Sequence, residues 1–488
     1  MKTQLKSGRI LFLLTAVLCI QLPVFAQFSG GDGTPANPFQ ITTLAQLDSV
    51  RYFLSSHFEL KNDIDADATK TWHPLVQKGT WTATTEYKRN EVVQHNNGTG
   101  LKNYYCIYPH TSGTTFDANK WLETILPAGT FLGFEPISYF PSASLTVTTQ
   151  LFTGTFNGNN FKISSLYIYR IEEYNCGLFG KIYNNNVLIK NIGVLNGTMY
   201  SICNGGLIVG WNRLGTIRNC YSTGTVTTHS NYGGAQLGGL VGRNGYTETG
   251  ANIHNSYSTA TVTGIPSLPS TYIGGLVGCN NGTISNSYAR GNVVGNYRVG
   301  GLSGNNYGGT ITNCYATGTV TANSEKGGLT GAHAYTITNS YWDKQTSLIT
   351  TSAGGTGKTT ADMIYPYTTG TYTNWDFVNT WTSDADKMKN NGYPYLISTP
   401  VLQGLDNTNY NNIKLTPSIS NGNFNIVSSN PITGIVVYNM LGKAIEFNKT
   451  TNSNNSVTLS LSGNYQGLIL IKATTVTGNE LLKGLVLK

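Results

Sequence analysis

Short alternations of apolar and polar residues return at regular intervals between residues 177 and 344. The segment from Gly274 reads GGLVGCNNGTISNSYARGNV, and the segments from Gly300 and Gly327 read GGLSGNNYGGTITNCYATGTV and GGLTGAHAYTITNSYWDK. The leucines at equivalent places in the six copies lie 26 to 36 residues apart: Leu178, Leu207, Leu240, Leu276, Leu302 and Leu329. A period of this length, without helical periodicity, is typical of a solenoid of strand-turn-strand coils. The pattern therefore predicts an all-β chain built around a parallel β-helix.

Three adjacent positions repeat in each of the last five copies. The middle position is small, Ser or Cys, and predicts a packed interior slot: Cys220, Ser256, Ser287, Cys314 and Ser340. The preceding asparagines predict an amide ladder up the stack: Asn219, Asn255, Asn286, Asn313 and Asn339. The following tyrosines predict an aromatic column: Tyr221, Tyr257, Tyr288, Tyr315 and Tyr341. Such a column could also stack on sugars, but its presence in every coil favours a structural role.

The flanks of the repeats predict caps for the two ends of the solenoid. Residues 27–78 hold an apolar spacing over Thr43 to Leu54 that predicts a short amphipathic helix, followed by a first strand over His57 to Ile64. The coils continue over residues 125–345, and residues 346–405 follow the last of them. We expect aromatic residues of this last segment to cover the open end: Trp375, Trp381 and Tyr393.

Residues 79–124 interrupt the coils with a different composition. Their aromatic order, W…Y…VV…YYC…HTSG…F…W, resembles the small β-stranded carbohydrate-binding modules of chitinases and of phage tail proteins. The resemblance implies an inserted β module that binds a polysaccharide or cell-surface glycan, since flat aromatic faces suit the apolar C–H groups of sugar rings. The candidate stacking residues are Trp81, Tyr87, Tyr105 and Trp121. Alternatively, Trp81, Tyr87 and Trp121 form the core of this small module.

The repeats themselves resemble the GLUG motif of secreted bacterial surface proteins. The motif core reads GLFG, GLVG, GLVG, GLSG and GLTG in five copies, and GLIVG in the sixth. The resemblance implies a surface protein of adhesin-like or glycan-binding character. It carries little information on chemistry.

The last part of the chain changes character again after a polar linker at 406–412. Residues 413–488 hold short alternating strands between Gly and Asn turns, which predicts a small immunoglobulin-like β-sandwich. The runs GIVVYNMLGK, GLILIK and GLVLK resemble the C-terminal sorting domain of type IX secretion substrates. This resemblance implies the type IX secretion machinery as a partner, and release or attachment at the outer-membrane surface.

The first residues predict export. Residues 1–26 combine a basic start, an apolar run from Ile10 to Ile20 and a small-residue cleavage site at Ala26, which is the pattern of a signal peptide. No other apolar run approaches the roughly 20 residues that a membrane helix requires, so no transmembrane segment is expected in the mature chain.

Composition agrees with a secreted β protein. Only 11% of the residues are charged, while 57 are glycine and 30 are tyrosine. A net charge of +8 over 488 residues, without a basic cluster, does not indicate a nucleic-acid partner. Six cysteines follow the signal peptide without a C-x-x-C pair, so disulfides are allowed but cannot be assigned.

The acidic residues argue against catalysis. Polysaccharide lyases and hydrolases on β-helices use clustered carboxylates, whereas residues 125–345 contain few, spread over different coils: Glu135, Glu172, Glu173, Glu248, Glu325 and Asp343. Glu172 and Glu173 point to opposite faces if the backbone is extended there. We therefore expect no catalytic, metal or cofactor site. The alternative is a β-helical polysaccharide lyase or glycoside hydrolase.

Overall fold

The computed structural model describes residues 28–138, 151–228, 233–265, 267, 271–399 and, with short gaps, 413–486. The expected signal peptide and linker lie outside the described residues. The chain divides into two compact units, Met1–Gln403 and Gly404–Lys488.

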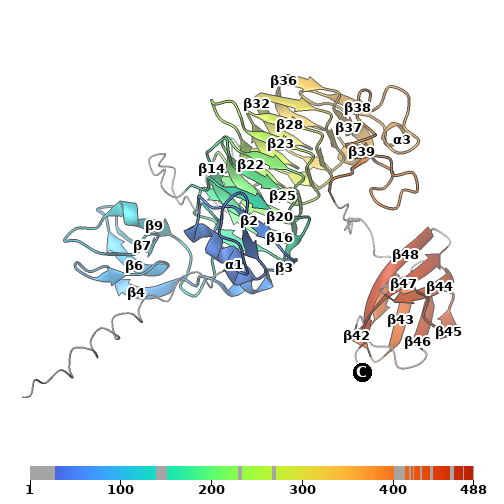
Figure 1. Ribbon diagram of the computed structural model, residues 1–488, viewed down its shortest axis with the longest axis horizontal. Coiled ribbons are helices and arrows are strands. Elements are labelled where there is room, and N and C mark those ends of the chain that lie inside the picture. The colour runs from blue at the N-terminus through green and yellow to red at the C-terminus, as the bar shows by residue number, and fades with distance from the viewer. Residues whose placement is uncertain are drawn as a thin grey trace, which may run out of the picture. The chain divides into compact units, whose positions relative to one another are not determined.

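Most of the first unit is a stack of short parallel strands that form three long sheets (Figure 1). The first sheet contains β1 (Phe39–Ile41), β2 (Phe58–Leu60), β10 (Thr155–Asn157), β14 (Phe179–Ile182), β15 (Leu188–Lys190), β18 (Val209–Asn212), β19 (Thr216–Arg218), β22 (Val241–Asn244), β23 (Asn252–His254), β27 (Val277–Asn280), β28 (Thr283–Ser285), β32 (Ser303–Thr312) and β36 (Thr330–Thr338).

The second sheet contains β3 (Ile64–Asp65), β11 (Lys162–Ser164), β12 (Tyr167–Arg170), β16 (Gly193–Ser201), β20 (Tyr221–Thr228), β24 (Tyr257–Ser258), β25 (Thr261–Thr263), β29 (Tyr288–Ala289), β30 (Val293–Val294), β33 (Tyr315–Ala316), β34 (Val320–Thr321), β37 (Tyr341–Asp343) and β38 (Thr356–Lys358). The third sheet contains β13 (Asn175–Cys176), β17 (Asn204–Gly205), β21 (Gln236–Gly238), β26 (Tyr272–Gly274), β31 (Tyr297–Gly300) and β35 (Ser324–Gly327). The predicted parallel β-helix is therefore confirmed.

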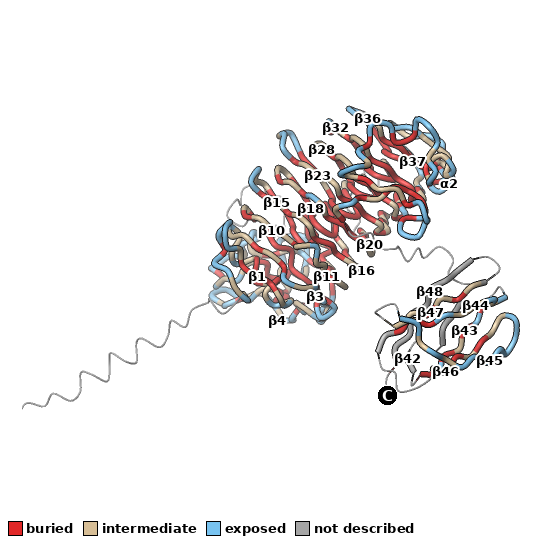
Figure 2. The backbone as a smooth tube through the Cα atoms, turned by 45° about the vertical axis from the view of Figure 1, so that its right-hand side comes forward, coloured by how far each residue is buried: buried red, intermediate tan, exposed pale blue. Residues whose placement is uncertain are grey.

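The core of the solenoid is a set of columns in which the same residue type stacks coil upon coil. Ile189, Ile217, Ile253, Ile284 and Ile311 pair in register through five neighbouring strands, and all five are completely buried. Figure 2 shows the buried positions running along the interior of the stack. Each isoleucine removed from water contributes about 1.5–3 kcal/mol, so the columns hold the coils together.

The predicted asparagine positions lie at sharp turns. Their backbones adopt the left-handed conformation, with φ between 45° and 54°, which asparagine tolerates better than most residues: Asn219, Asn255, Asn286, Asn313 and Asn339. The side chain of Asn219 donates to Asn191 (2.9 Å), and that of Asn313 donates to Asn286 (3.3 Å). The adjacent Ser and Cys residues are buried, as the slot prediction requires.

A second amide ladder lies at positions that the sequence interpretation missed. Asn212 donates to Asn244 (2.8 Å), Asn244 to Asn280 (2.9 Å) and Asn280 to Asn306 (2.8 Å). All four side chains are completely buried. An unpaired amide would be costly there, so each coil depends on the next to satisfy its asparagine.

The tyrosine column is buried beneath the segment that follows the last coil. Adjacent rings of Tyr257, Tyr288 and Tyr315 stack with centroids 4.7 and 4.9 Å apart. Trp375, Trp381 and Tyr393 contact these rings, so they cover the side of the stack, whereas the sequence predicts that they cover its open end. The elements of this segment are α2 (Lys344–Ser347), α3 (Thr360–Met363), β39 (Trp381–Thr382) and β40 (Tyr395–Leu396).

The N-terminal helix forms where the apolar spacing predicts it. Its elements are α1 (Leu44–Ser49) and the 3-10 turn η2 (Val50–Tyr52), and a further 3-10 turn, η3 (Asp67–Thr71), follows the first coil. The side chain of Thr43 caps α1 by accepting a hydrogen bond from the Gln46 amide. Leu47 and Val50 are buried in the solenoid core.

The inserted segment forms a small separate sheet between β3 and β10. Its elements are β4 (Val76–Thr80), β5 (Glu86–Tyr87), β6 (Glu91–Asn96), β7 (Leu101–Cys106), β8 (His110–Thr111), the 3-10 turn η4 (Ala118–Lys120) and β9 (Trp121–Thr124). The order of the main sheet is β4-β6-β7-β9, and β5 pairs with β8.

The second unit consists of two four-stranded sheets around one core. The first contains β41 (Ile413–Thr416), β43 (Asn423–Ser428), β46 (Ser456–Leu461) and β45 (Phe447–Ser453). The second contains β42 (Ile419–Ser420), β48 (Gly478–Val486), β47 (Gly467–Thr475) and β44 (Ile432–Asn439). Its likeness to an immunoglobulin domain stays a prediction.

Candidate functional site

The structure buries three of the four aromatic residues that the sequence assigns to sugar stacking. Tyr87, Tyr105 and Trp121 are 2%, 1% and 4% exposed, whereas Trp81 is partly exposed. The prediction is wrong in treating the three buried rings as a surface, because a covered ring cannot stack on a sugar. Whether Trp81 binds a glycan stays a prediction.

The burial follows from the two faces of the module sheet. On one face, Tyr87, Tyr104 and Trp121 form the module's own core, with Trp81 and Phe116 packed at its margin. On the other face, Tyr105 packs with Leu132 and Ile171 of the solenoid part of the chain. The module is therefore built against the solenoid and does not project as an isolated lobe.

A half-exposed aromatic patch remains on the module. We define the module patch as Trp81, His95 and Phe116, each of which is partly exposed. The rings of His95 and Phe116 stack at 4.0 Å with an interplanar angle of 9°, and the Trp81 ring meets both edge-on at 5.5 and 5.9 Å. Phe116 is also stacked on the buried Trp121 at 5.5 Å, so the partly exposed ring surface that remains for a ligand belongs mainly to Trp81 and His95. The sequence interpretation did not select His95, because a single histidine on a strand gives no signal of its own.

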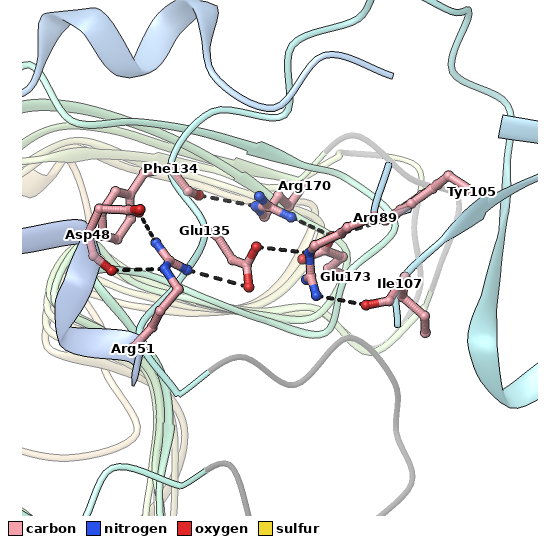
Figure 3. Close-up of polar contacts among 9 residues, drawn as sticks. All are labelled: Asp48, Arg51, Arg89, Tyr105, Ile107, Phe134, Glu135, Arg170 and Glu173. Atoms are coloured by element: carbon pink, nitrogen blue, oxygen red, sulfur yellow. Dashed lines mark hydrogen bonds and ion pairs between the residues drawn. The ribbon is translucent and has the colours of Figure 1, made fainter. Parts of the chain in front are cut away.

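A buried cluster of charged residues joins the module to the solenoid (Figure 3). Glu135 lies between Arg51 of the N-terminal cap and Arg89 of the module, with nitrogen–oxygen distances of 3.4 and 2.9 Å. Burial alone would raise the pKa of the Glu135 carboxyl, but the neighbouring arginines hold it below its ordinary value. Arg89 also donates to the carbonyl of Ile107 (2.7 Å). One carboxylate thus links three segments that are far apart in the sequence.

The second half of the cluster is an almost completely buried ion pair. Arg170 bonds Glu173 at 2.8 Å, and both side chains are no more than 1% exposed. The phenol of Tyr105 donates to the same Glu173 oxygen at 2.9 Å, and Arg170 also donates to the Phe134 carbonyl at 3.1 Å. Removing one partner of a buried pair leaves an uncompensated charge, so Arg170 and Glu173 hold each other in place and give Tyr105 of the module a fixed acceptor.

Glu172 has a different environment from its neighbour Glu173. Its carboxylate accepts a hydrogen bond from the Ile125 amide (2.8 Å), at the point where the chain leaves the module. Burial raises the pKa of Glu172 from 4.5 to about 7, despite this hydrogen bond. The two adjacent glutamates therefore act on separate partners and not as a catalytic pair.

The described residues hold no cluster of three or more His, Cys, Asp or Glu side chains that could bind a metal ion. The six cysteines within the described residues are all free and buried. Burial raises the pKa of Cys220 and Cys314 to about 12, so these thiols are poor nucleophiles. They serve as small apolar residues in the interior slot.

Comparison with known protein families identifies the repeated motif in four segments of the chain. The GLUG motif matches residues 203–227, 233–263, 269–294 and 295–321. GLUG repeats are therefore present in the coils that contain β17 to β34. The matched segments include the ladder of Asn212, Asn244, Asn280 and Asn306, and four members of the tyrosine column: Tyr221, Tyr257, Tyr288 and Tyr315.

The chain is also similar to two larger proteins. It is 30% identical to halomucin of Haloquadratum walsbyi over 215 residues, which is 43% of this chain and 2% of halomucin. It is 28% identical over 231 residues to a protein of Evansella cellulosilytica described as a Gly-rich membrane protein, covering 44% of this chain and 19% of that protein. The chain thus spans less than a fifth of either relative. No solved structure matches it.

Among the residues that the structure describes, no helix is both long and apolar enough to cross a membrane.

Proposed function

We propose that this protein is a secreted or cell-surface, non-catalytic repeat protein that binds a glycan through the module patch. The observation that carries the proposal is the patch itself: Trp81 and His95 keep partly exposed ring surface, supported by the stacked Phe116, on a module fixed to a long solenoid. Aromatic faces of this kind suit the apolar C–H groups of a pyranose ring. The names of the two relatives, a mucin and a membrane protein, favour a place at the cell surface.

The partners of the acidic residues support the absence of catalysis. Glu135 and Glu173 are held by arginines inside the charge cluster. Glu248 and Glu325 pair with Arg213 and Arg298 in different coils. Asp343 caps α2 and accepts a hydrogen bond from Tyr393. A glycosidase needs two carboxyl groups facing one bond, and these residues do not supply such a pair.

The second unit is proposed as the sorting domain. Its resemblance to type IX secretion substrates and its division from the first unit as a compact body support this role. Deletion of residues 413–488 should then retain the protein in the periplasm of a type IX host. Equal amounts of full-length and truncated protein at the surface would contradict the assignment.

Pull-down on insoluble chitin and cellulose tests the glycan proposal with the full mature chain. We expect Trp81→Ala and Phe116→Ala each to reduce retention several-fold, because a stacked aromatic contributes about 1 kcal/mol. Tyr52→Ala is the matched control, since Tyr52 is 71% exposed and lies outside the module. The proposal fails if the wild type stays in the supernatant on every glycan, or if all three variants bind equally.

A further inference from the structure

A group of cations and aromatic rings gathers at one corner of the solenoid, away from the module. Lys181 of β14 pairs in register with Trp211 of β18, which pairs with Arg243 of β22. The turns that follow these strands supply Tyr183, Arg213 and Tyr246. We define the corner cluster as these residues together with Glu248: Lys181, Tyr183, Trp211, Arg213, Arg243, Tyr246 and Glu248.

The cations of the corner cluster lie on its rings. The ammonium of Lys181 is 4.6 Å from the centroid of Trp211, and the Arg243 guanidinium is 5.2 Å from the same ring. Arg243 is also 4.6 Å from the Tyr246 ring, and the Arg213 guanidinium is 4.2 Å from Tyr183. These distances are within the range of cation–π attraction. The rings thus hold three positive charges close together.

The negative charge in the cluster does not balance the positive charge. Arg213 forms an ion pair with Glu248, and the Tyr183 hydroxyl donates a hydrogen bond to the same carboxylate at 3.3 Å. Arg243 has no ion pair within the described part of the chain, and its Nε is buried without a hydrogen-bond acceptor. Burial, and to a smaller extent the nearby Arg213, lower the pKa of Lys181 to about 8.

The sequence supplies no further acid to this part of the solenoid. Between Ile125 and Gln345 the remaining acidic residues are Glu135, Glu172, Glu173, Glu325 and Asp343, and each has the partner described above. Within the described part of the chain, Arg243 therefore stays without an ion pair beside exposed ring surface, of which Tyr246 is 39% exposed. An anionic ligand with an apolar face would match both properties.

Exposed rings continue along the same edge of the solenoid. Tyr307 of β32 and Tyr335 of β36 each lie one residue beyond the position in register with Asn244 of β22. They are 53% and 58% exposed, and their ring centroids are 6.3 Å apart. Neighbouring strands are separated by about 4.8 Å, so Tyr246 and Tyr335 lie three strand steps, or about 14 Å, apart along the stack. Figure 1 shows β14, β22, β32 and β36 following one another along this edge. A row of this length matches a polymer of several sugars better than a single sugar.

We propose that the corner cluster binds an acidic polysaccharide, with the carboxylate or sulfate of one sugar on Arg243 and its pyranose ring on Tyr246. Guanidinium groups bind such anions through paired N–H donors, and the tyrosine ring supplies an apolar surface beside them. The chain of sugars continues towards Tyr307 and Tyr335. The site shares no residue with the module patch, so it goes beyond the glycan binding proposed above.

Affinity electrophoresis of the full mature chain tests this site. The native gels contain polygalacturonate, dextran sulfate, neutral dextran or polyphosphate, at physiological ionic strength. We expect polygalacturonate, dextran sulfate or both to retard the protein, and neutral dextran and polyphosphate to leave its mobility unchanged. The first two probes separate carboxylate from sulfate, and polyphosphate is an anion without a sugar ring.

Two variants and a matched control locate the binding. Arg243→Gln and Tyr246→Ala should each raise the dissociation constant about tenfold. Arg218→Gln removes the same charge from an exposed position on β19 and should change it less than twofold. Thermal melting of every variant verifies that the fold is intact.

Three results overturn the inference: no retardation by either acidic polysaccharide, equal retardation by polyphosphate, or equal weakening by Arg218→Gln and Arg243→Gln. Trp81→Ala separates the two proposals. Its loss of chitin or cellulose binding concerns the module patch alone, and its retardation by the acidic probes should stay that of the wild type.

Discussion

Substitution of Glu172 by glutamine should stabilise the protein at alkaline pH. The pKa of Glu172 rises from 4.5 to about 7 because the folded chain buries the carboxyl. Each pKa unit corresponds to about 1.4 kcal/mol, so ionising Glu172 costs the folded state about 3 kcal/mol at pH 8. Below pH 4.5 the group is protonated in both the folded and unfolded chains, and the cost disappears. Between pH 4.5 and 7 the cost grows as the unfolded chain releases its proton first.

Glutamine mimics the protonated acid and keeps an oxygen for the Ile125 amide. The free energy of unfolding of Glu172→Gln should therefore match the wild type at pH 4 and exceed it by up to about 3 kcal/mol at pH 8. Urea titrations followed by tryptophan fluorescence, at half-unit steps from pH 4 to 8, measure the difference. Glu325→Gln is the control, since Glu325 is an exposed glutamate paired with Arg298 and does not contribute to the pKa shift of Glu172. A difference that is constant across this range, or a less stable variant at pH 8, would refute the reasoning.

Three further predictions address the parts that hold the first unit together. Glu173→Gln should lower the free energy of unfolding by about 3 kcal/mol in urea titrations, because it leaves Arg170 buried without its carboxylate; a loss below about 1 kcal/mol would contradict this. Tyr315→Phe removes hydrogen bonds to Pro394 and Asn390, so limited proteolysis should cut residues 360–396 faster, and an unchanged cutting rate would show that packing alone holds the segment. The six buried thiols should be silent to a thiol reagent in the native protein and react in denaturant, and rapid native labelling would place one of them at the surface.

The solenoid was predictable because every coil repeats the same physical requirement. A small residue such as Ser287 is needed where coils pack, and Asn286 is favoured where the backbone turns left-handed. Because the pattern occurs in five copies, these positions can be recognised as structural requirements and not as chance similarities. The ladder of Asn212, Asn244 and Asn280 was missed although the sequence holds a signal for it, since each asparagine stands two residues after the second glycine of its repeat core.

The module was less predictable because its sheet has two covered faces. Alternation along β7 shows that Tyr104 and Tyr105 point to opposite sides, but the sequence does not say which side meets the solenoid. No local sequence pattern predicts the cluster of charged residues between the module and the solenoid. Arg51, Glu135 and Arg170 come from separate segments, and only the folded chain brings them together.

The register of the parallel strands has a consequence for how such chains can change over generations. Within the stack, the strands of each coil pair with those of the coil before it and the coil after it, and both pairings are made by the same kinds of residue. A duplication or loss of one repeat in the gene would leave matching surfaces on either side of the junction. The stack would lengthen or shorten by about 4.8 Å, and the first and last coils would keep their covers. Gain or loss of repeats can therefore change the length of the solenoid by whole coils, without requiring new contacts between coils.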